Sequence, residues 1–464
     1  MRCLALSLGL ALIFAAGAAQ SDGITLPSYE RTVLENGTVL LLSENHDVPL
    51  IGLEAVVRGG AASDPQDKHG LASLVAGLLV KGANERGSAE FAEAVASRGG
   101  RISSTAGLES LSVSAEFMSK DAALMVELVA DALQRPALSR EEFEKLRDRN
   151  INLIKSAKGA DPDGLMPSYA NAFLFGDHPY GNPVDGSEAS LARINHDDLL
   201  AYHADRVGGD RLVISVSGDF EIDLMRAALT SAFSDWRAAT GAVPEIVAPA
   251  PQATSRVYLI DKPGATQSYF YIGNIGVARS FAGRAELDIA NTVFGGRFTS
   301  MLMTELRTKS GLSYSAQSRL RRYSQPGSVF IASFTENGTT TEALQTALAT
   351  LGQLRDSGLD EAMITSSRNY IMGQFPPRLE TAAQLAGVFA MLEINDLDAS
   401  YINDYGASLS AATPASIAAI IDQVYPTLDN LVYVILGDAA SIREQVTLYG
   451  PVTEIALSEP RFHP

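Results

Sequence analysis

Residues 211–219 read RLVISVSGD, and residues 430–438 read NLVYVILGD. Each stretch is a short apolar run rich in β-branched residues that ends in Gly-Asp, which is typical of a buried strand followed by a turn. Each follows an amphipathic helical pattern, and the second begins 219 positions after the first. A repeat on this scale indicates a duplicated domain rather than a solenoid of short repeats.

The elements that precede the first of these stretches indicate the fold class. The first half opens with alternating residues around the hairpin turn Asn36-Gly37, continues with a strand over 50–58 and an apolar helix over 70–81, and then has two strands, 102–106 and 110–117, before long helices. Strands joined by hairpins and helices in runs predict an α+β fold. We therefore expect two homologous domains from an internal duplication, each a mainly antiparallel sheet packed with helices.

A segment rich in Ala, Pro and Thr separates the two halves. It spans residues 237–255 and contains prolines at 244, 249 and 251, which is the composition of a linker. A chain of 464 residues is too long for one ordinary core and suits two domains. We expect an N-terminal domain over 28–236 and a C-terminal domain over 256–450.

The overall composition narrows the possible functions. Hydrophobic residues make up 46% of the chain and charged residues 19%, which indicates a globular rather than a disordered protein. The net charge of -18 argues against a nucleic-acid partner, because such partners need a basic surface. The same charge permits basic or extended peptide substrates without demonstrating them.

Residues 1–19 have the pattern of a signal peptide. Arg2 supplies a positive charge, residues 4–16 form an apolar run that is too short for a stable span, and residues 16–19 are small residues suited to cleavage. The only cysteine, Cys3, lies inside this segment, and no later run reaches membrane-spanning length. We expect a soluble mature chain in the bacterial periplasm without disulfides; the alternative is an uncleaved N-terminal anchor.

Residues 305–314 read ELRTKSGLSY, a pattern that predicts the end of a helix, a glycine turn and the start of a strand. Arg307 and Tyr314 lie seven positions apart across this turn. Both carry hydrogen-bond donors on long side chains, and together they could hold a carbonyl oxygen or a developing oxyanion. In the alternative interpretation, Arg307 stabilises a helix C-terminus and Tyr314 fills a half-buried strand.

The order and spacing of several motifs resembles the insulinase-like zinc peptidases, also called the pitrilysin or processing-peptidase family. The resemblance extends from Tyr29 to about residue 450. Its matching motifs are ENG at 35–37, GLA at 70–72, KG at 81–82, HPYG at 178–181, the two Gly-Asp strand ends, and LR at 306–307 followed by GLSY at 311–314.

The zinc-binding motif of that family is degenerate in this sequence. Active members carry H-x-x-E-H on the first helix, where two histidines bind zinc and the glutamate acts as general base. The matching positions here hold Ser73, Ala76 and Gly77, and the stretch 149–155, where a further glutamate ligand is expected, has no carboxylate. The resemblance therefore implies no metal and no other cofactor in this chain.

The Arg/Tyr element of the family is present. The resemblance implies that Arg307 and Tyr314 help to hold substrate, and stabilise its oxyanion, in the zinc site of a partner chain that carries H-x-x-E-H. The expected protein is the zinc-free, substrate-positioning subunit of a heteromeric zinc endopeptidase that acts on peptides, a heterodimer or a higher assembly with zinc in the partner. Phe294, Gly295 and Gly296 are expected to line the substrate chamber; the alternative for this loop is a helix C-cap. The alternative for the whole chain is a non-catalytic peptide-binding or scaffold protein with the same fold.

Overall fold

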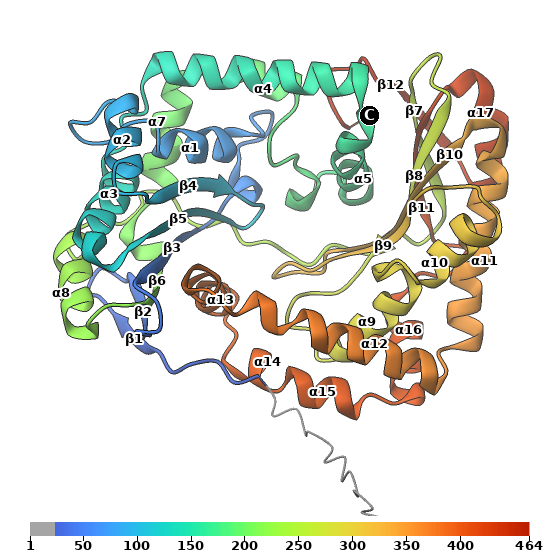
Figure 1. The fold of residues 1–464 in the computed structure, drawn as a ribbon. Coiled ribbons are helices and arrows are strands. Elements are labelled where there is room, and N and C mark those ends of the chain that lie inside the picture. The colour runs from blue at the N-terminus through green and yellow to red at the C-terminus, as the bar shows by residue number, and fades with distance from the viewer. Residues whose placement is uncertain (1–23, 464) are drawn as a thin grey trace, which may run out of the picture.

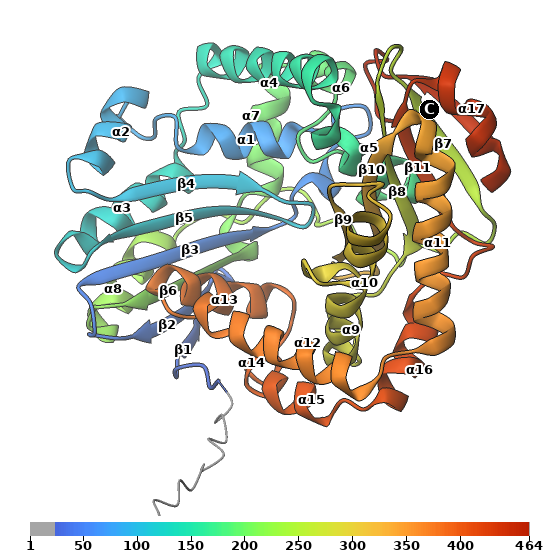
Figure 2. The ribbon, with the colours of Figure 1, turned by 45° about the vertical axis from the view of Figure 1, so that its right-hand side comes forward.

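The computed structural model describes residues 24–463, which form two halves built around one six-stranded sheet each (Figure 1, Figure 2). The strands are β1 (Glu30–Val33), β2 (Val39–Glu44), β3 (Leu50–Arg58), β4 (Arg101–Ala106), β5 (Ser110–Met118), β6 (Leu212–Gly218), β7 (Arg256–Asp261), β8 (Gln267–Ile275), β9 (Ala316–Arg321), β10 (Ser328–Glu336), β11 (Val432–Gly437) and β12 (Val452–Ala456).

The two sheets share one topology. The first has the order β1-β2-β6-β3-β5-β4 and the second the order β12-β7-β11-β8-β10-β9. In each, the strand that ends in Gly-Asp is parallel to the first long strand, as β6 is to β2 and β11 to β7, and antiparallel to its other neighbour. Only the outermost strands differ, because β1 is antiparallel to β2 whereas β12 is parallel to β7. This correspondence confirms the predicted α+β fold of two homologous halves.

The repeated apolar runs form central strands. Every residue of β6 and of β11 is buried, because each strand has a partner on both sides and side chains from helices on its faces. This central position in each sheet is the physical reason why the apolar pattern of the two strands is continuous.

The α-helices surround the sheets (Figure 1). They are α1 (Leu71–Leu79), α2 (Ser88–Ala96), α3 (Ala122–Gln134), α4 (Arg140–Ala160), α5 (Met166–Phe175), α6 (Glu188–Arg193), α7 (His196–Arg206), α8 (Ile222–Phe233), α9 (Arg284–Asn291), α10 (Met301–Met303), α11 (Thr340–Ser357), α12 (Glu361–Gln374), α13 (Ala382–Ile394), α14 (Ser400–Asn403), α15 (Tyr405–Ala411), α16 (Pro414–Val424) and α17 (Ala439–Val446).

Helix α13 belongs to the second half of the sequence but packs against the first sheet, on β3 and β6 (Figure 2). The approach is so close that a Cβ atom on Gly52 of β3 would lie 2.4 Å from the Cα atom of Ala383. At the other end of the helix, the Arg58 guanidinium donates to the carbonyl oxygens of Glu393 at 2.9 Å and Ile394 at 2.6 Å. These contacts fix α13 on the sheet of the other half.

Helix α5 makes the reciprocal exchange, since it belongs to the first half and packs on β8 and β11 of the second sheet. The Phe173 ring stacks on Tyr258 with centroids 4.5 Å apart, and Arg256 donates to the Phe173 carbonyl oxygen at 2.6 Å. Each exchanged helix therefore presents its C-terminal carbonyls to an arginine of the sheet that it covers, which suits the helix dipole. The two halves are joined through their cores.

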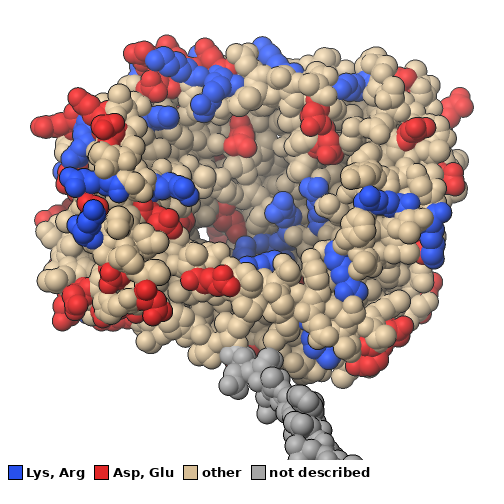
Figure 3. Space-filling model, in the orientation of Figure 1, with Lys and Arg blue, Asp and Glu red and all other residues tan. Residues whose placement is uncertain are grey.

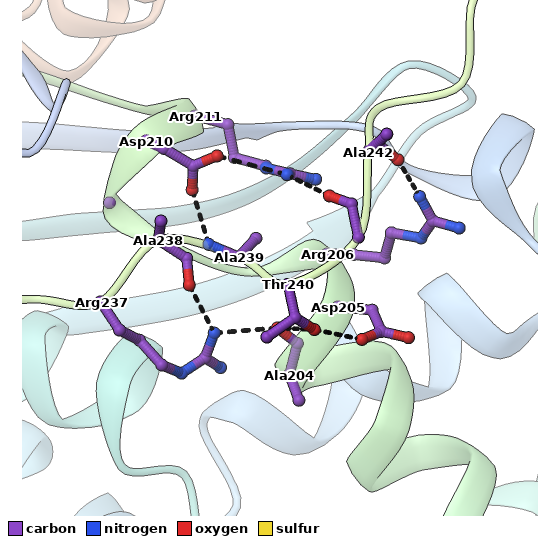
Figure 4. A network of polar contacts seen from close by, with 12 residues as sticks. Ala204, Asp205, Arg206, Asp210, Arg211, Arg237, Ala238, Ala239, Thr240 and Ala242 are labelled. Carbon is purple, nitrogen blue, oxygen red and sulfur yellow. Dashed lines mark hydrogen bonds and ion pairs between the residues drawn. The ribbon is translucent and has the colours of Figure 1, made fainter.

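The segment 237–255 contains no helix or strand. Its first residues are held by polar contacts to the end of α7 and to the chain before β6 (Figure 4). Arg211 donates to the Gly241 carbonyl oxygen at 2.6 Å, and Asp210 accepts from the Ala239 N–H at 2.7 Å. The start of the connection is thereby fixed to the first half, while the domain boundaries stay a prediction.

The predicted signal peptide, residues 1–19 with Cys3, lies outside the described residues. Within residues 24–463, no helix is both long enough and apolar enough to cross a membrane.

Candidate functional site

Helix α1 carries the positions at which active relatives of the resembled family have their zinc motif. The Ser73 hydroxyl donates to the Asp185 carboxylate at 2.8 Å, and the Ala76 side chain is buried. Gly77 abuts the side chain of Leu146 on α4. A hydroxyl, a methyl group and an aliphatic neighbour do not fit a zinc ion, which requires imidazole, thiolate or carboxylate ligands.

A buried carboxylate accepts hydrogen bonds from backbone N–H groups at the N-terminus of α1. Asp64 accepts from the Gly70 N–H at 2.8 Å and from the Ala72 N–H at 2.9 Å. Burial raises the pKa of Asp64 to about 7, although the backbone donors act in the opposite direction. Within residues 24–463, no cluster of three or more His, Cys, Asp or Glu side chains is arranged to hold a metal ion. That the chain carries no zinc stays a prediction.

The Arg307/Tyr314 turn has the local structure that the sequence predicts. The π-helical segment η7 (Thr304–Lys309) ends before Gly311, which has a φ of 68°, and β9 follows. The turn is held in place by bonds from the Ser313 N–H to the Leu306 carbonyl oxygen at 3.0 Å and from the Thr335 hydroxyl to the Leu312 carbonyl oxygen at 2.8 Å. Arg307 and Tyr314 are therefore presented from an ordered turn.

Arg307 lies between two aromatic rings. Its guanidinium carbon is 4.3 Å from the centroid of Tyr314 and 4.8 Å from that of Phe298. Tyr314 is 71% exposed and Phe298 is 67% exposed, so neither ring belongs to a core. Tyr314 precedes the strand rather than filling it. In the described part of the chain, the Arg307 side chain forms no ion pair or hydrogen bond besides its contacts with the two rings, which leaves its N–H donors available to a ligand.

A cavity of about 770 Å³ opens beside this pair and is lined by Gly295, Gly296, Arg307 and Tyr314 among others. The two glycines belong to a second π-helical segment, η6 (Thr292–Gly296). A Cβ atom on Gly295 would lie 2.2 Å from the backbone nitrogen of Ser318, so glycine permits η6 to lie against β9. Segments of this type are frequent at functional sites.

The expectation for Phe294 needs correction. Its side chain is 1% exposed and packs edge-on against Tyr425, with ring centroids 5.4 Å apart. An aromatic side chain beside two glycines is drawn into the core by the hydrophobic effect, so only the glycines face the cavity.

A second cavity, of about 750 Å³, lies between the halves, and Figure 3 shows the hollow on this face of the molecule. The β9–β10 hairpin reaches across to the first half here. The Glu109 carboxylate accepts from the Ser324 N–H at 3.0 Å and from the Tyr180 hydroxyl at 2.6 Å. The Tyr180 and Tyr323 rings lie 4.6 Å apart. The HPYG motif thus joins the halves, a role that its sequence did not indicate.

The edge strand β4 of the first sheet also borders on α1. None of its six residues is buried, and no strand of the described chain lies beyond it. An edge strand offers unpaired backbone donors and acceptors, so an extended peptide can pair with it.

Models of two domains of one peptidase family match the chain. The model described as insulinase (peptidase family M16) matches residues 39–186, and the model described as peptidase M16 inactive domain matches residues 193–370.

Relatives of this chain occur in several bacteria. An uncharacterized zinc protease of Mycobacterium leprae is 26% identical over 82% of this chain and 84% of its own length. The uncharacterized zinc protease YmxG of Bacillus subtilis is 24% identical over 76% of this chain and 85% of its own. A Helicobacter pylori relative, 23% identical over 74% of this chain and 78% of its own, bears the name non-peptidase homolog YmxG.

Solved structures show the same fold. The peptidase M16 inactive domain from Pseudomonas fluorescens superposes with a TM-score of 0.81 at 20% identity, over 88% of this chain and 98% of that one. A protease from Helicobacter pylori superposes with a TM-score of 0.80 at 18% identity, over 89% of this chain and 100% of that one.

Proposed function

Because this chain belongs to the insulinase family of peptidases, peptidase family M16, we propose that it is the zinc-free, substrate-positioning subunit of a heteromeric zinc endopeptidase. In this proposal, a partner subunit with H-x-x-E-H supplies the zinc and the general base, and this chain supplies Arg307 and Tyr314. The substrate is a peptide.

One observation carries the proposal. Arg307 keeps its donors unbound between two exposed aromatic rings at a cavity, while the zinc-motif positions hold Ser73, Ala76 and Gly77. Arg307 is half-buried, so its donors stay reachable from the cavity and can bind a ligand there. In this proposal, the site binds substrate, and the partner supplies the groups that activate water.

The chemistry available to this chain is positioning and charge stabilisation. The Arg307 guanidinium can donate two parallel hydrogen bonds to an oxygen-bearing group, and the Tyr314 hydroxyl can donate a third. Donors held in fixed positions stabilise an oxyanion without reorganisation, which is a large term in acyl-transfer catalysis. The open edge of β4 can align the peptide backbone.

The test combines the purified chain with the zinc-motif subunit from the same cell. Peptide hydrolysis and metal content are measured for each protein alone and for the mixture. We expect hydrolysis only in the mixture and zinc only in the partner. Chelator-sensitive hydrolysis by the rigorously purified single chain would contradict the proposal.

A second candidate function is a non-catalytic peptide-binding or scaffold protein. The name of the Helicobacter pylori relative, non-peptidase homolog, favours it. The same experiment distinguishes the two candidates. A scaffold protein gives no hydrolysis in any mixture and binds peptide without a partner subunit.

The proposed location is the periplasm, on the basis of the signal-peptide pattern in residues 1–19. Immunoblotting of periplasmic, membrane and cytoplasmic fractions tests this. A chain retained with the membrane supports the uncleaved anchor instead.

A further inference from the structure

We propose that the arginines around strand β9 select acidic peptide segments, an inference that rests on the proposed function and names its substrate class. It concerns the wall of the hollow that is formed by the second half. Figure 3 shows Lys and Arg side chains gathered on the wall of the hollow near β9.

Two adjoining cavities lie beside β9, one of about 770 Å³ and one of about 540 Å³. Eight arginines but only one acidic residue, Asp288, line them together. Asp288 forms ion pairs with Arg284 and Arg322. Within residues 24–463, the other six have no ion pair with a carboxylate; they are Arg279, Arg297, Arg307, Arg319, Arg321 and Arg378.

Several of these guanidinium groups keep unused donors. The Nε atoms of Arg279, Arg297 and Arg319 are buried and have no hydrogen-bond partner in the described chain. Buried donors without a partner are rare in folded proteins and need an explanation.

The spacing of the arginines on β9 fits an extended chain. Gln317, Arg319 and Arg321 alternate with the buried Ala316 and Ser318, so they share one face of the strand. Side chains two positions apart on a strand are separated by about 6.6 Å. Alternate carboxylates of an extended peptide have the same separation, so Glu side chains at every second position can meet Arg319 and Arg321 together.

Some arginines elsewhere on the molecule are neutralised by carboxylates. Arg86 binds Glu127 and Asp131, and Arg226 binds Glu30 and Asp223. The net charge of -18 is thus not uniform over the surface. Because salt screens exposed charges beyond about 8 Å, the local arginines rather than the net charge decide what binds in the cavities.

The neighbouring aromatic rings favour a peptide over a nucleic acid or a free anion. Phe298 and Tyr314 stand exposed at the same cavity and can contact apolar side chains between acidic ones. A nucleic acid would extend beyond the cavities onto a chain of net charge -18, which repels it. A short acidic segment is attracted by the arginines that line the cavities and does not extend onto the rest of the surface.

The experiment measures binding by the full purified chain alone, using fluorescence anisotropy. The probes are three labelled extended peptides of equal length in which Glu, Gln or Lys alternates with apolar residues, together with a single-stranded oligothymidine and unlabelled inorganic phosphate as competitor. We expect the Glu peptide to bind at least about tenfold tighter than the Gln peptide, with an affinity that falls as salt rises.

The decisive variant is the double substitution Arg319→Gln/Arg321→Gln. We expect it to raise Kd for the Glu peptide by about tenfold or more and to leave the Gln peptide unchanged. The matched control is Arg140→Gln/Arg149→Gln, which removes the same charge from exposed positions on α4 and should bind as the wild type does. Arg321→Gln alone, at an exposed position, serves if the double variant is unstable.

Four results would overturn the inference. These are equal affinity for the three peptides, equal loss of binding in the control variant, binding of oligothymidine as tight as that of the Glu peptide, and displacement of the Glu peptide by phosphate at an equal concentration. Failure of the proposed function is a different result. If only the proposed function is wrong, the chain still binds the acidic peptide more tightly, but no mixture hydrolyses peptide. If only the present inference is wrong, the mixture hydrolyses acidic and neutral peptides at equal rates.

Discussion

The guanidinium carbon of Arg307 lies 4.3 Å from the centroid of the Tyr314 ring, across a turn that brings the end of η7 back to the start of β9. The contact holds the guanidinium in place without using its N–H donors. It also fixes an exposed tyrosine beside a cavity of about 770 Å³. Both residues line this cavity, and their proposed roles can be tested separately.

Replacing Tyr314 by Phe keeps the ring that packs on Arg307 and removes only the hydroxyl. We expect the mixture with the zinc-motif subunit to lose about a hundredfold in kcat, because one hydrogen-bond donor to the developing charge is absent. Assembly, measured by size-exclusion chromatography, should not change since the side chain is 71% exposed. The same substitution at Tyr29, a half-buried residue that lines neither cavity, is the control. Equal kcat for Tyr314→Phe and wild type would contradict a catalytic role of the Tyr314 hydroxyl.

The contact between Glu109 and the β9–β10 hairpin should contribute to stability. Glu109→Gln loses charge-assisted bonds from the Ser324 N–H and the Tyr180 hydroxyl. We expect the free energy of unfolding to fall by about 1–3 kcal/mol, measured by urea denaturation. Glu144→Gln, at an exposed position of α4, is the control and should change it by less than about 0.5 kcal/mol. A loss equal to that of the control would mean that the hairpin contact adds nothing.

The exchange of α13 makes a prediction for Gly52. Because an added Cβ atom would lie 2.4 Å from the Ala383 backbone, Gly52→Ala must displace the helix or the strand. We expect a loss of about 1–3 kcal/mol or more in the free energy of unfolding. Gly387→Ala, in α13 itself, is the matched control: nothing lies near its added Cβ, so the helix should keep or gain stability. Two variants of equal stability would contradict the close packing of α13 on β3.

Asp64 should make stability depend on pH. Its pKa is about 7 in the folded chain and near 3.8 when unfolded, so the folded state binds the proton more tightly. Asp64 therefore contributes favourably to the free energy of unfolding below about pH 4. This contribution falls by roughly 1.4 kcal/mol per pH unit as the pH rises toward about 7. Chemical denaturation of wild type and Asp64→Asn across this range isolates the effect. The difference between the two proteins should change with pH, and a constant difference would show that Asp64 does not titrate there.

The sequence predicted most of the fold for physical reasons. The runs at 212–218 and 432–437 are apolar throughout because they form central strands, and the Asn36-Gly37 turn joins β1 to β2. Boundaries shifted slightly. The helix predicted over 70–81, for example, is α1 and runs from Leu71 to Leu79.

Other features could not be read from local patterns. An amphipathic helix has an apolar face, but nothing in α5 or α13 states which sheet that face will cover. Glu109 and Ser324 are 215 positions apart and meet only because the halves are folded together. Local patterns do not predict helix α5, because Pro167 and the loop-like residues 161–164 precede its apolar stretch. Arg307 and Tyr314 were found because the chain itself sets their separation across one turn.

The measurement that tests the central claim most directly is kcat for peptide hydrolysis by the zinc-motif subunit mixed with wild type, with Arg307→Ala, or with the control Arg149→Ala. The account predicts activity with wild type and with the control, and a loss of about a hundredfold or more with Arg307→Ala while the complex still assembles. Equal kcat in all three mixtures, or no hydrolysis even with wild type, would contradict it.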